Sequence, residues 1–172
     1  AGILAVLGTM PDEVTHIYCI DDGCPEETGR YIEDRVEDYR VTVLYHDENL
    51  GVGGAMKSGY RAALADNMEV IVKVDGDGQM DPEDLKSLLD PVVTGQTDYS
   101  KGNRLYTGEA FKLIPKARYF GNSVLTLLTK IASGYWHVAD SQSGYTAMSS
   151  KVLSALDWRF MYTRYGQPNH LL

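Results

Sequence analysis

Short apolar runs alternate with longer amphipathic segments over the first half of the chain, and this alternation limits the fold more than any other feature. Three runs rich in β-branched or aromatic residues are typical of strands, at 15–20, 41–46 and 69–74. The segments 27–39 and 54–65 between them are long enough for helices. Strands and helices in alternation predict an α/β fold with a mostly parallel sheet and helices on both faces.

The remainder of the chain continues this pattern less regularly. Segment 82–93 is typical of a helix that has a proline in its first turn and Asp81 as its cap. The residues Asp-Tyr-Ser at 98–100 are typical of a short strand. Three further elements are expected: a helix at 116–133, a loop at 140–149 that enters a strand, and a short helix at 150–156.

Length, charge and cysteine content exclude several classes of protein. A chain of 172 residues buries one sizeable core, so residues 1–172 are expected to form a single domain. The net charge is −8 and no basic stripe is present, which argues against a nucleic-acid partner. Two cysteines, Cys19 and Cys24, are too few for a disulfide scaffold and indicate reducing, intracellular surroundings. The longest apolar stretch, at 123–136, is interrupted by Lys130 and is shorter than the roughly 20 residues of a membrane span.

Acidic residues follow two of the three expected strands. The first strand leads into Asp21 and Asp22, and the third leads into the sequence Asp-Gly-Asp-Gly-Gln that contains Asp75, Asp77 and Gln79. Ligands of open parallel sheets bind beyond the carboxyl ends of the strands. Two carboxylates two residues apart share one face of an extended segment, and the intervening glycines let the backbone approach a ligand closely. Oxygen ligands of this kind suit Mg²⁺ or Mn²⁺, which is held by few protein groups when substrate phosphates complete its shell.

This acidic stretch is open to two other interpretations. Aspartate and glycine also cluster in ordinary surface turns, where Asp81 would simply cap the next helix. The stretch also begins like the calcium loop of an EF-hand. That loop requires glycine at its sixth position and glutamate at its twelfth, where this chain has Met80 and Lys86. A calcium loop is therefore excluded.

Two further stretches offer groups for phosphate. The glycine-rich sequence at 48–60 follows a strand and opens a helix, so its backbone N–H groups could bind phosphate, although close packing of helix against strand explains the glycines equally well. It does not match the G-x-G-x-x-G pattern. Arg104, in the sequence Lys-Gly-Asn-Arg, lies after a strand, and arginine binds phosphate in a bidentate manner. Taken alone, it is also typical of an ordinary surface arginine.

A third polar stretch, Asp-Ser-Gln-Ser-Gly-Tyr, begins at Asp140. This aspartate is a candidate for a carboxylate beside a reacting centre, or for the cap of a turn. The stretch lacks the G-x-S-x-G pattern of a hydrolase nucleophile. The four histidines show no spacing typical of metal ligands and are expected to be structural or exposed: His16, His46, His137 and His170.

Taken together and in order, these motifs resemble the family 2 glycosyltransferases. The similarity runs from about residue 1 to residue 172 and rests on IDDG, HDENLGVGGAMKSGY, VDGDGQMDPED, KGNR, RYFGN and DSQSGYTAMS. The branch with the greatest resemblance contains the dolichyl-phosphate mannose synthases and the bacterial polyprenyl-phosphate sugar transferases. The resemblance implies the GT-A fold, a Rossmann-like α/β architecture.

The resemblance also implies a role for each motif residue. Asp22 would contact the nucleotide base with Asp21 supporting its loop, and Asp75 and Asp77 would form the DxD motif. The implied metal ligands for Mn²⁺ or Mg²⁺ are Asp75, Asp77 and Gln79. Arg104 would bind the donor phosphates, and Asp140 would lie near the transferred sugar and the acceptor, so these two are the implied catalytic residues.

The implied reaction is metal-dependent, inverting transfer of a sugar from a UDP- or GDP-linked donor to a polyprenyl phosphate. Two alternatives stay open: transfer to a saccharide hydroxyl, and a non-catalytic nucleotide- or cation-binding domain. The implied location is the cytoplasm, with peripheral association at the cytoplasmic face of a membrane. Relatives begin with a strand ending in a motif like P-A-Y-N-E and continue beyond the last residues seen here. We therefore expect the domain to be partial at both ends, without its first strand and its C-terminal extension.

Overall fold

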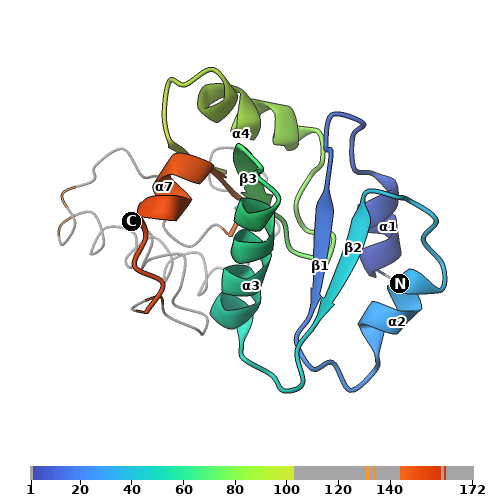
Figure 1. The fold of residues 1–172 in the computed structure, drawn as a ribbon. Coiled ribbons are helices and arrows are strands. Elements are labelled where there is room, and N and C mark those ends of the chain that lie inside the picture. Colours follow the sequence, from blue (N-terminus) through green and yellow to red (C-terminus); the bar gives the residue numbers. More distant parts are fainter. Residues whose placement is uncertain (1, 103–130, 132–133, 135–143, 160, 162–172) are drawn as a thin grey trace.

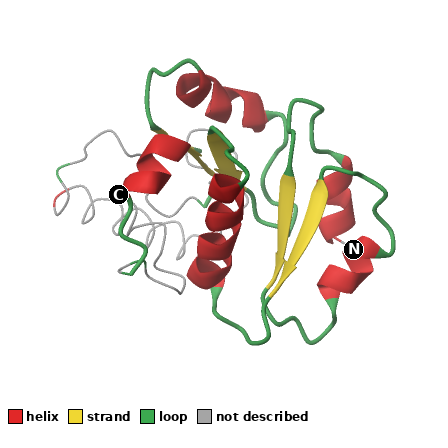
Figure 2. Ribbon diagram, in the orientation of Figure 1, coloured by secondary structure: helices red, strands yellow, loops and turns green. Residues whose placement is uncertain are grey.

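The computed structural model describes residues 2–102, 131, 134, 144–159 and 161, and these form an α/β arrangement (Figure 1). In chain order the elements are α1 (Gly2–Gly8), β1 (Ile17–Asp21), α2 (Thr28–Glu33), β2 (Val41–Tyr45), α3 (Val52–Ala65), β3 (Val70–Lys73), α4 (Asp84–Val93), β4 (Tyr99–Lys101), β5 (Thr146–Ser149) and α7 (Ser150–Ala155). The expected alternation of strand and helix is therefore confirmed over residues 17–101. Figure 2 shows the helices arranged around the strands.

The strands form two sheets. β1 and β2 are parallel and in register from Ile17 opposite Val41 to Asp21 opposite Tyr45. β5 lies between β3 and β4 and is antiparallel to both. Because β3 and β4 each run opposite to β5, they run in the same direction as each other. The first sheet with α2 forms the expected βαβ unit, and the second adds an antiparallel strand to the α/β arrangement.

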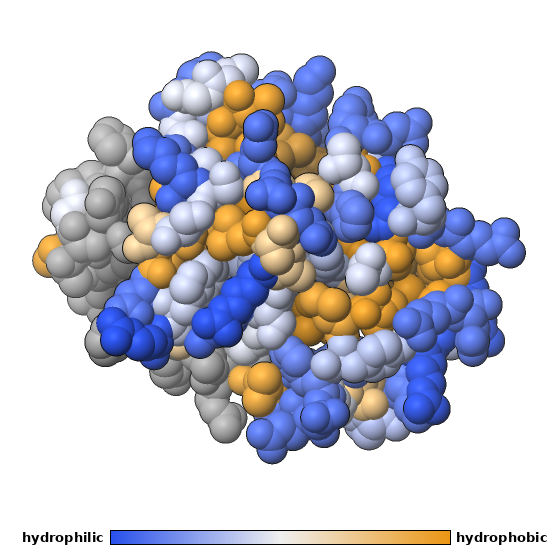
Figure 3. Space-filling model, viewed as in Figure 1, coloured by the Kyte–Doolittle hydropathy of each residue, from blue (hydrophilic) through white to orange (hydrophobic). Residues whose placement is uncertain are grey.

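A cavity of about 840 Å³ lies between the two sheets. Its lining includes every residue from 15 to 22, along β1, and every residue from 70 to 76, along β3. Successive side chains of a strand point to opposite faces, so a lining of consecutive residues means that strand edges face the cavity. Among the described residues, β1 pairs only with β2 and β3 only with β5. Figure 3, which is viewed as in Figure 1, shows hydrophobic side chains at the surface of this face of the molecule.

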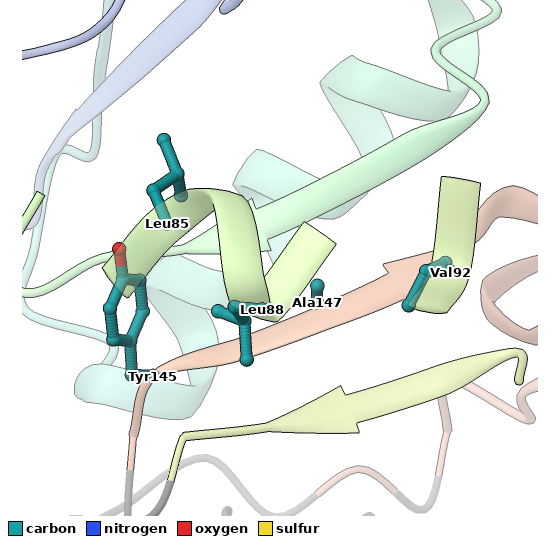
Figure 4. Close-up of a cluster of buried hydrophobic side chains, with 5 residues drawn as sticks. All are labelled: Leu85, Leu88, Val92, Tyr145 and Ala147. Carbon is teal, nitrogen blue, oxygen red and sulfur yellow. The ribbon is translucent and has the colours of Figure 1, made fainter. Parts of the chain in front are cut away.

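The core lies on both faces of β5. Ala147, on one face, contacts a cluster in which α4 contributes Leu85, Leu88 and Val92 (Figure 4). Met148, on the other face, belongs to a second cluster formed by Tyr60, Met148, Leu153 and Met161. Ala147 is 0 % and Met148 1 % exposed, so the second sheet is covered by helices on both faces. The covering of both faces that the sequence predicts is thus found around β5.

Two helices begin or end away from their expected positions. The helix expected at 27–39 ends at Glu33, because only Ile32 of its apolar side chains is well buried and Tyr39 is 92 % exposed. Without packing, the last two turns are not stabilised. Arg40 instead holds the chain there, through Asp38 and through the carbonyls of Pro11 and Val14.

The helix expected at 82–93 begins at Asp84, so Asp81 is not its N-cap. The carboxylate of Asp81 accepts a hydrogen bond from the N–H of Glu83, at 2.9 Å, within the turn that precedes α4. β5 occupies the last four residues of the stretch 140–149, which was expected to be a loop that enters a strand, so the strand begins earlier than expected. The helix expected at 150–156 is α7. The helix expected at 116–133 lies outside the described residues, apart from Ile131.

Candidate functional site

Asp21, the last residue of β1, holds the loop that leads to α2. It is 8 % exposed, and its two carboxylate oxygens accept hydrogen bonds from the N–H groups of Cys24, at 2.7 Å, and Gly29, at 2.6 Å. A methyl group on Gly29 would lie 2.9 Å from the same carboxylate and 2.5 Å from the ring of Tyr45. The sequence therefore needs glycine at this point for the carboxylate to reach the start of the helix.

Asp22 is joined to two other polar side chains. Its Oδ1 lies 2.6 Å from Nδ1 of His46, and Nε2 of His46 lies 2.8 Å from the hydroxyl of Ser58 on α3. Asp22 also accepts hydrogen bonds from the N–H groups of Leu50, at 2.9 Å, and Gly51, at 2.8 Å. Burial raises the pKa of the Asp22 carboxyl, but the hydrogen bonds from His46 and the two N–H groups outweigh burial and lower it below its ordinary value.

Sequence reasoning missed His46, although a signal was present. In the parallel pair, Asp21 lies opposite Tyr45, so the next residues, Asp22 and His46, leave the sheet side by side. Spacing along the chain cannot reveal this pair, because 24 residues separate the two side chains. The pairing also depends on the register of the two strands, Ile17 opposite Val41, which the structure supplies.

The glycine-rich loop uses two of its backbone N–H groups within the protein. Those of Leu50 and Gly51, at the start of α3, are bonded to Asp22 rather than pointing freely toward a ligand. Gly51 has a φ of 82°, a conformation that favours glycine. A methyl group on Gly54 would lie 2.5 Å from Cβ of Leu50, so this glycine serves close packing. Both findings favour the packing interpretation of the loop over a phosphate loop.

The DGDGQ stretch leaves β3 and turns sharply. β3 ends at Lys73, so Asp75 and Asp77 do not share one face of an extended strand as expected. The chain turns at Gly76 to Gly78, and Gly78 has a φ of 77°. A methyl group on Gly76 would lie 3.0 Å from Ile3 of α1, so this side of the turn is covered by a helix of the same chain.

The two aspartates of this stretch have different surroundings. Asp77 is exposed, and its Oδ1 accepts a hydrogen bond from the N–H of Gln79 at 3.0 Å. The carboxylate of Asp75 is paired with the ammonium group of Lys73, whose side chain is only 13 % exposed. Lys73 is the second polar group that sequence reasoning missed. Its signal is a lysine inside an otherwise apolar strand, directly before an acidic turn.

Three motifs that lie far apart in the sequence meet at the end of β3. A methyl group on Gly144, from the DSQSGY stretch, would lie 2.5 Å from Nζ of Lys73 and 3.1 Å from Oδ2 of Asp75. The hydroxyl of Tyr145 donates to the carbonyl of Asp81 at 3.3 Å. The carbonyl of Tyr145 accepts from the N–H of Gly102, in the KGNR stretch, at 2.8 Å.

The structure brings together part of the expected site. Asp21, Asp22 and Asp75 line the same cavity between the sheets, so the two acidic runs do face one space. Asp77 and Gln79 are not part of the lining. Arg104 and Asp140 lie outside the described residues, so their positions are not tested.

The donor groups suit a metal ion only when a ligand completes its shell. Within the described part of the chain, no three His, Cys, Asp or Glu side chains gather closely enough to hold a metal ion. Asp75 is already neutralised by Lys73, whereas Asp77 is exposed and one of its oxygens accepts the N–H of Gln79. A site with one or two carboxylates fits Mg²⁺ or Mn²⁺ that is bound mainly by substrate phosphates. Within the same ranges, no helix has the length and apolarity needed to cross a membrane.

Comparison with known proteins agrees with the resemblance seen in the sequence. UDP-N-acetylglucosamine–dolichyl-phosphate N-acetylglucosaminyltransferase of Methanococcus voltae is 29 % identical over 163 residues, which cover 87 % of this chain and 64 % of that protein. Undecaprenyl-phosphate mannosyltransferase of Micrococcus luteus is 32 % identical over 154 residues, or 88 % of this chain and 62 % of that protein. Polyprenol monophosphomannose synthase of Mycolicibacterium smegmatis is 30 % identical over 144 residues, which cover 83 % of this chain and 54 % of that protein.

The chain thus spans about half to two thirds of the length of these curated relatives. The profile described as "Glycosyl transferase family 2" matches residues 2–157, which is most of the sequence. The α/β arrangement, with acidic runs at the ends of β1 and β3, accords with this match. The chain therefore belongs to glycosyl transferase family 2.

Proposed function

We propose that this chain is part of an enzyme that transfers a sugar from a nucleoside-diphosphate donor to a polyprenyl phosphate. The names of the three relatives support this choice, because each refers to a dolichyl, undecaprenyl or other polyprenol phosphate product or acceptor. The observation that carries most weight is the meeting of the DGDGQ, KGNR and DSQSGY stretches at the end of β3. Ligands of open α/β sheets bind at such strand ends.

We assign the donor to the space beyond β1 and β3. Asp22 would face the base, with Asp21 holding the loop beneath it, and the diphosphate would lie toward Asp75 and Asp77. Mg²⁺ or Mn²⁺ held by Asp77 and Gln79, with Asp75 nearby, would supply positive charge to the departing diphosphate. Lys73 lies beside Asp75, and its ammonium group offsets the charge of that carboxylate. Arg104 is proposed to bind the donor phosphates and Asp140 to lie beside the acceptor.

The reaction would be an inverting displacement. An oxygen of the acceptor forms a bond to the anomeric carbon, while the bond from that carbon to the diphosphate oxygen breaks and the nucleoside diphosphate leaves. A lipid phosphate has a second pKa of about 6, so it is substantially ionised at neutral pH and can attack without a general base. A saccharide hydroxyl would need a base such as Asp140.

We also propose that these residues are one part of a single catalytic domain. The facing edges of β1 and β3 support this proposal, because a buried strand of a parallel sheet pairs on both sides. A strand between them would unite the two sheets into the continuous sheet expected from the family. An acceptor with a polyprenyl tail implies that the enzyme works at a membrane surface, and we propose its cytoplasmic face.

Thermal denaturation with a panel of UDP- and GDP-sugars, with and without Mn²⁺, tests donor binding directly. A donor that binds the folded state raises the melting temperature by mass action. We expect one class of donor to do so only with the metal, and Asp77→Asn to abolish the shift. Stabilisation that is independent of Mn²⁺ would reject the metal-dependent donor site.

A transfer assay with radiolabelled donor then separates the acceptors. We expect label to move to polyprenyl phosphate and not to free saccharides. Label on a saccharide instead would favour the second type of transferase. Donor binding without transfer to either acceptor, measured with the full-length protein, would favour a binding domain.

A further inference from the structure

The orientation of the His46 ring follows from its two partners. Nδ1 faces the carboxylate of Asp22, which only accepts hydrogen bonds, so Nδ1 must carry a proton. In the neutral imidazole, Nε2 then accepts from the hydroxyl of Ser58. The side chains of His46 and Asp22 are 11 % and 18 % exposed, so both bonds are largely shielded from solvent. The ring is therefore fixed between β1 and α3.

The acceptor capacity of Asp22 is nearly filled. A carboxylate has about four acceptor positions, two on each oxygen. Oδ1 accepts from His46 and from the N–H of Leu50, so both of its positions are taken. Oδ2 accepts from the N–H of Gly51, which leaves one position open. A new ligand can therefore donate one hydrogen bond to this carboxylate.

We propose that His46 is a positioning residue that fixes Asp22 so that it accepts one N–H from the nucleobase, which selects uracil over guanine. Uracil has a single ring N–H between two carbonyls. Guanine offers two parallel donors, its ring N–H and its amino group, and needs both carboxylate oxygens to satisfy them. With Oδ1 occupied by His46 and Leu50, that paired contact is blocked. This inference rests on the proposed function, because it assumes that Asp22 faces the base.

Two substitutions at His46 separate positioning from general stability. In His46→Asn the amide nitrogen lies near the place of Nδ1 and can still donate to Asp22. In His46→Gln the amide reaches toward Ser58, near the place of Nε2, and the bond to Asp22 is lost. The backbone amides of Leu50 and Gly51 report on Asp22 without any nucleotide. We expect their hydrogen exchange to be about 10-fold faster in His46→Gln and within about 2-fold of wild type in His46→Asn.

Nucleotide affinity tests the second half of the inference. With Mn²⁺ present, we expect the wild-type chain and His46→Asn to bind UDP at least about 10-fold more tightly than GDP, and His46→Gln to lose most of this preference. Equal or tighter binding of GDP by the wild type would overturn the selection of uracil. If neither UDP nor GDP binds the wild type, the proposed donor site and the selection of uracil both fail, while the exchange measurement still decides the positioning role.

A measurement on the unmodified protein covers the case in which a variant does not fold. Nitrogen-15 chemical shifts distinguish the two neutral forms of histidine. We expect His46 to carry its proton on Nδ1 at pH 8. A proton on Nε2 in that spectrum, or unchanged exchange at Leu50 and Gly51 in both variants, would overturn the positioning role.

Discussion

Replacing Asp21 by asparagine is expected to destabilise the fold strongly, although the residue belongs to an acidic run at a candidate binding site. The carboxylate is 8 % exposed and accepts from two backbone N–H groups, those of Cys24 and Gly29. Asparagine has nearly the same shape, but it offers one acceptor oxygen, and its amino group would face the second N–H. One hydrogen bond to a charged group is lost, a loss of about 1.5–3 kcal/mol, and one buried N–H is left without a partner, at about 1–3 kcal/mol.

Allowing for relaxation of the loop, we expect Asp21→Asn to lower the free energy of unfolding by about 3 kcal/mol. Urea denaturation followed by circular dichroism measures this directly. With a slope of about 1–3 kcal/mol per molar urea, the midpoint should fall by about 1–3 M. Asp77→Asn is the matched control, because Asp77 is exposed and, among the residues that the structure describes, accepts only from Gln79. That variant should stay within about 0.5 kcal/mol of wild type. An Asp21→Asn midpoint as close to wild type as that of Asp77→Asn would refute the reasoning.

Three further predictions address other parts of the structure. The pKa of the Asp22 carboxyl is lowered in the folded state, so its contribution to stability is complete above about pH 4 and is lost as the pH falls through the folded-state pKa. Below about pH 4, the urea midpoint of wild type should therefore drop more steeply than that of Asp22→Asn. Parallel curves for the two proteins would contradict this prediction. Leu88→Ala in the core should lower the free energy of unfolding, measured by calorimetry, by about 2–5 kcal/mol. In Val93→Ala, on the same helix but at a side chain that is 65 % exposed, the free energy of unfolding should fall by less than about 0.5 kcal/mol. Equal losses in the two variants would argue against the packing in Figure 4. Lys73→Met removes a positive charge beside Asp75, so Mn²⁺ should bind several-fold more tightly in a titration calorimeter when UDP or GDP is present to complete its shell. Unchanged or weaker binding would count against the metal site.

The presence of strands and helices could be predicted from the sequence more accurately than the residues at which they begin and end. The strands were predictable because β-branched residues gather in short runs, and all three of the early ones were found within two residues of their expected bounds. The length of α2 was not predictable from the sequence. Its apolar pattern continues to Tyr39, but a helix of that length needs tertiary packing, and the exposed side chain of Tyr39 contributes no packing. The antiparallel strand β5 was expected as a strand, but its place between β3 and β4 depends on contacts between distant parts of the chain, such as Val70 opposite Ser149 and Tyr99 opposite Met148.

The candidate site shows the same division. Asp21, Asp22 and Asp75 were found from their positions after apolar runs, and they do line one cavity. What the pattern could not reveal is how differently the three carboxylates are used. Asp21 is occupied by backbone donors, Asp22 by His46 and a loop, and Asp75 by Lys73. These differences depend on hydrogen bonds between residues that are remote in sequence.

Within the part of the chain that the structure describes, the edges of β1 and β3 that face the cavity have no partner strand, and this affects how the protein behaves in concentrated solution. Each edge presents a row of backbone N–H and C=O groups that must find partners in water or in another polypeptide. An unprotected edge of this kind is a template on which a second molecule can add a strand. The apolar side chains beside it favour that addition, since an added strand would bury them as well. Whether these residues stay monomeric therefore depends on what occupies the space between the two sheets.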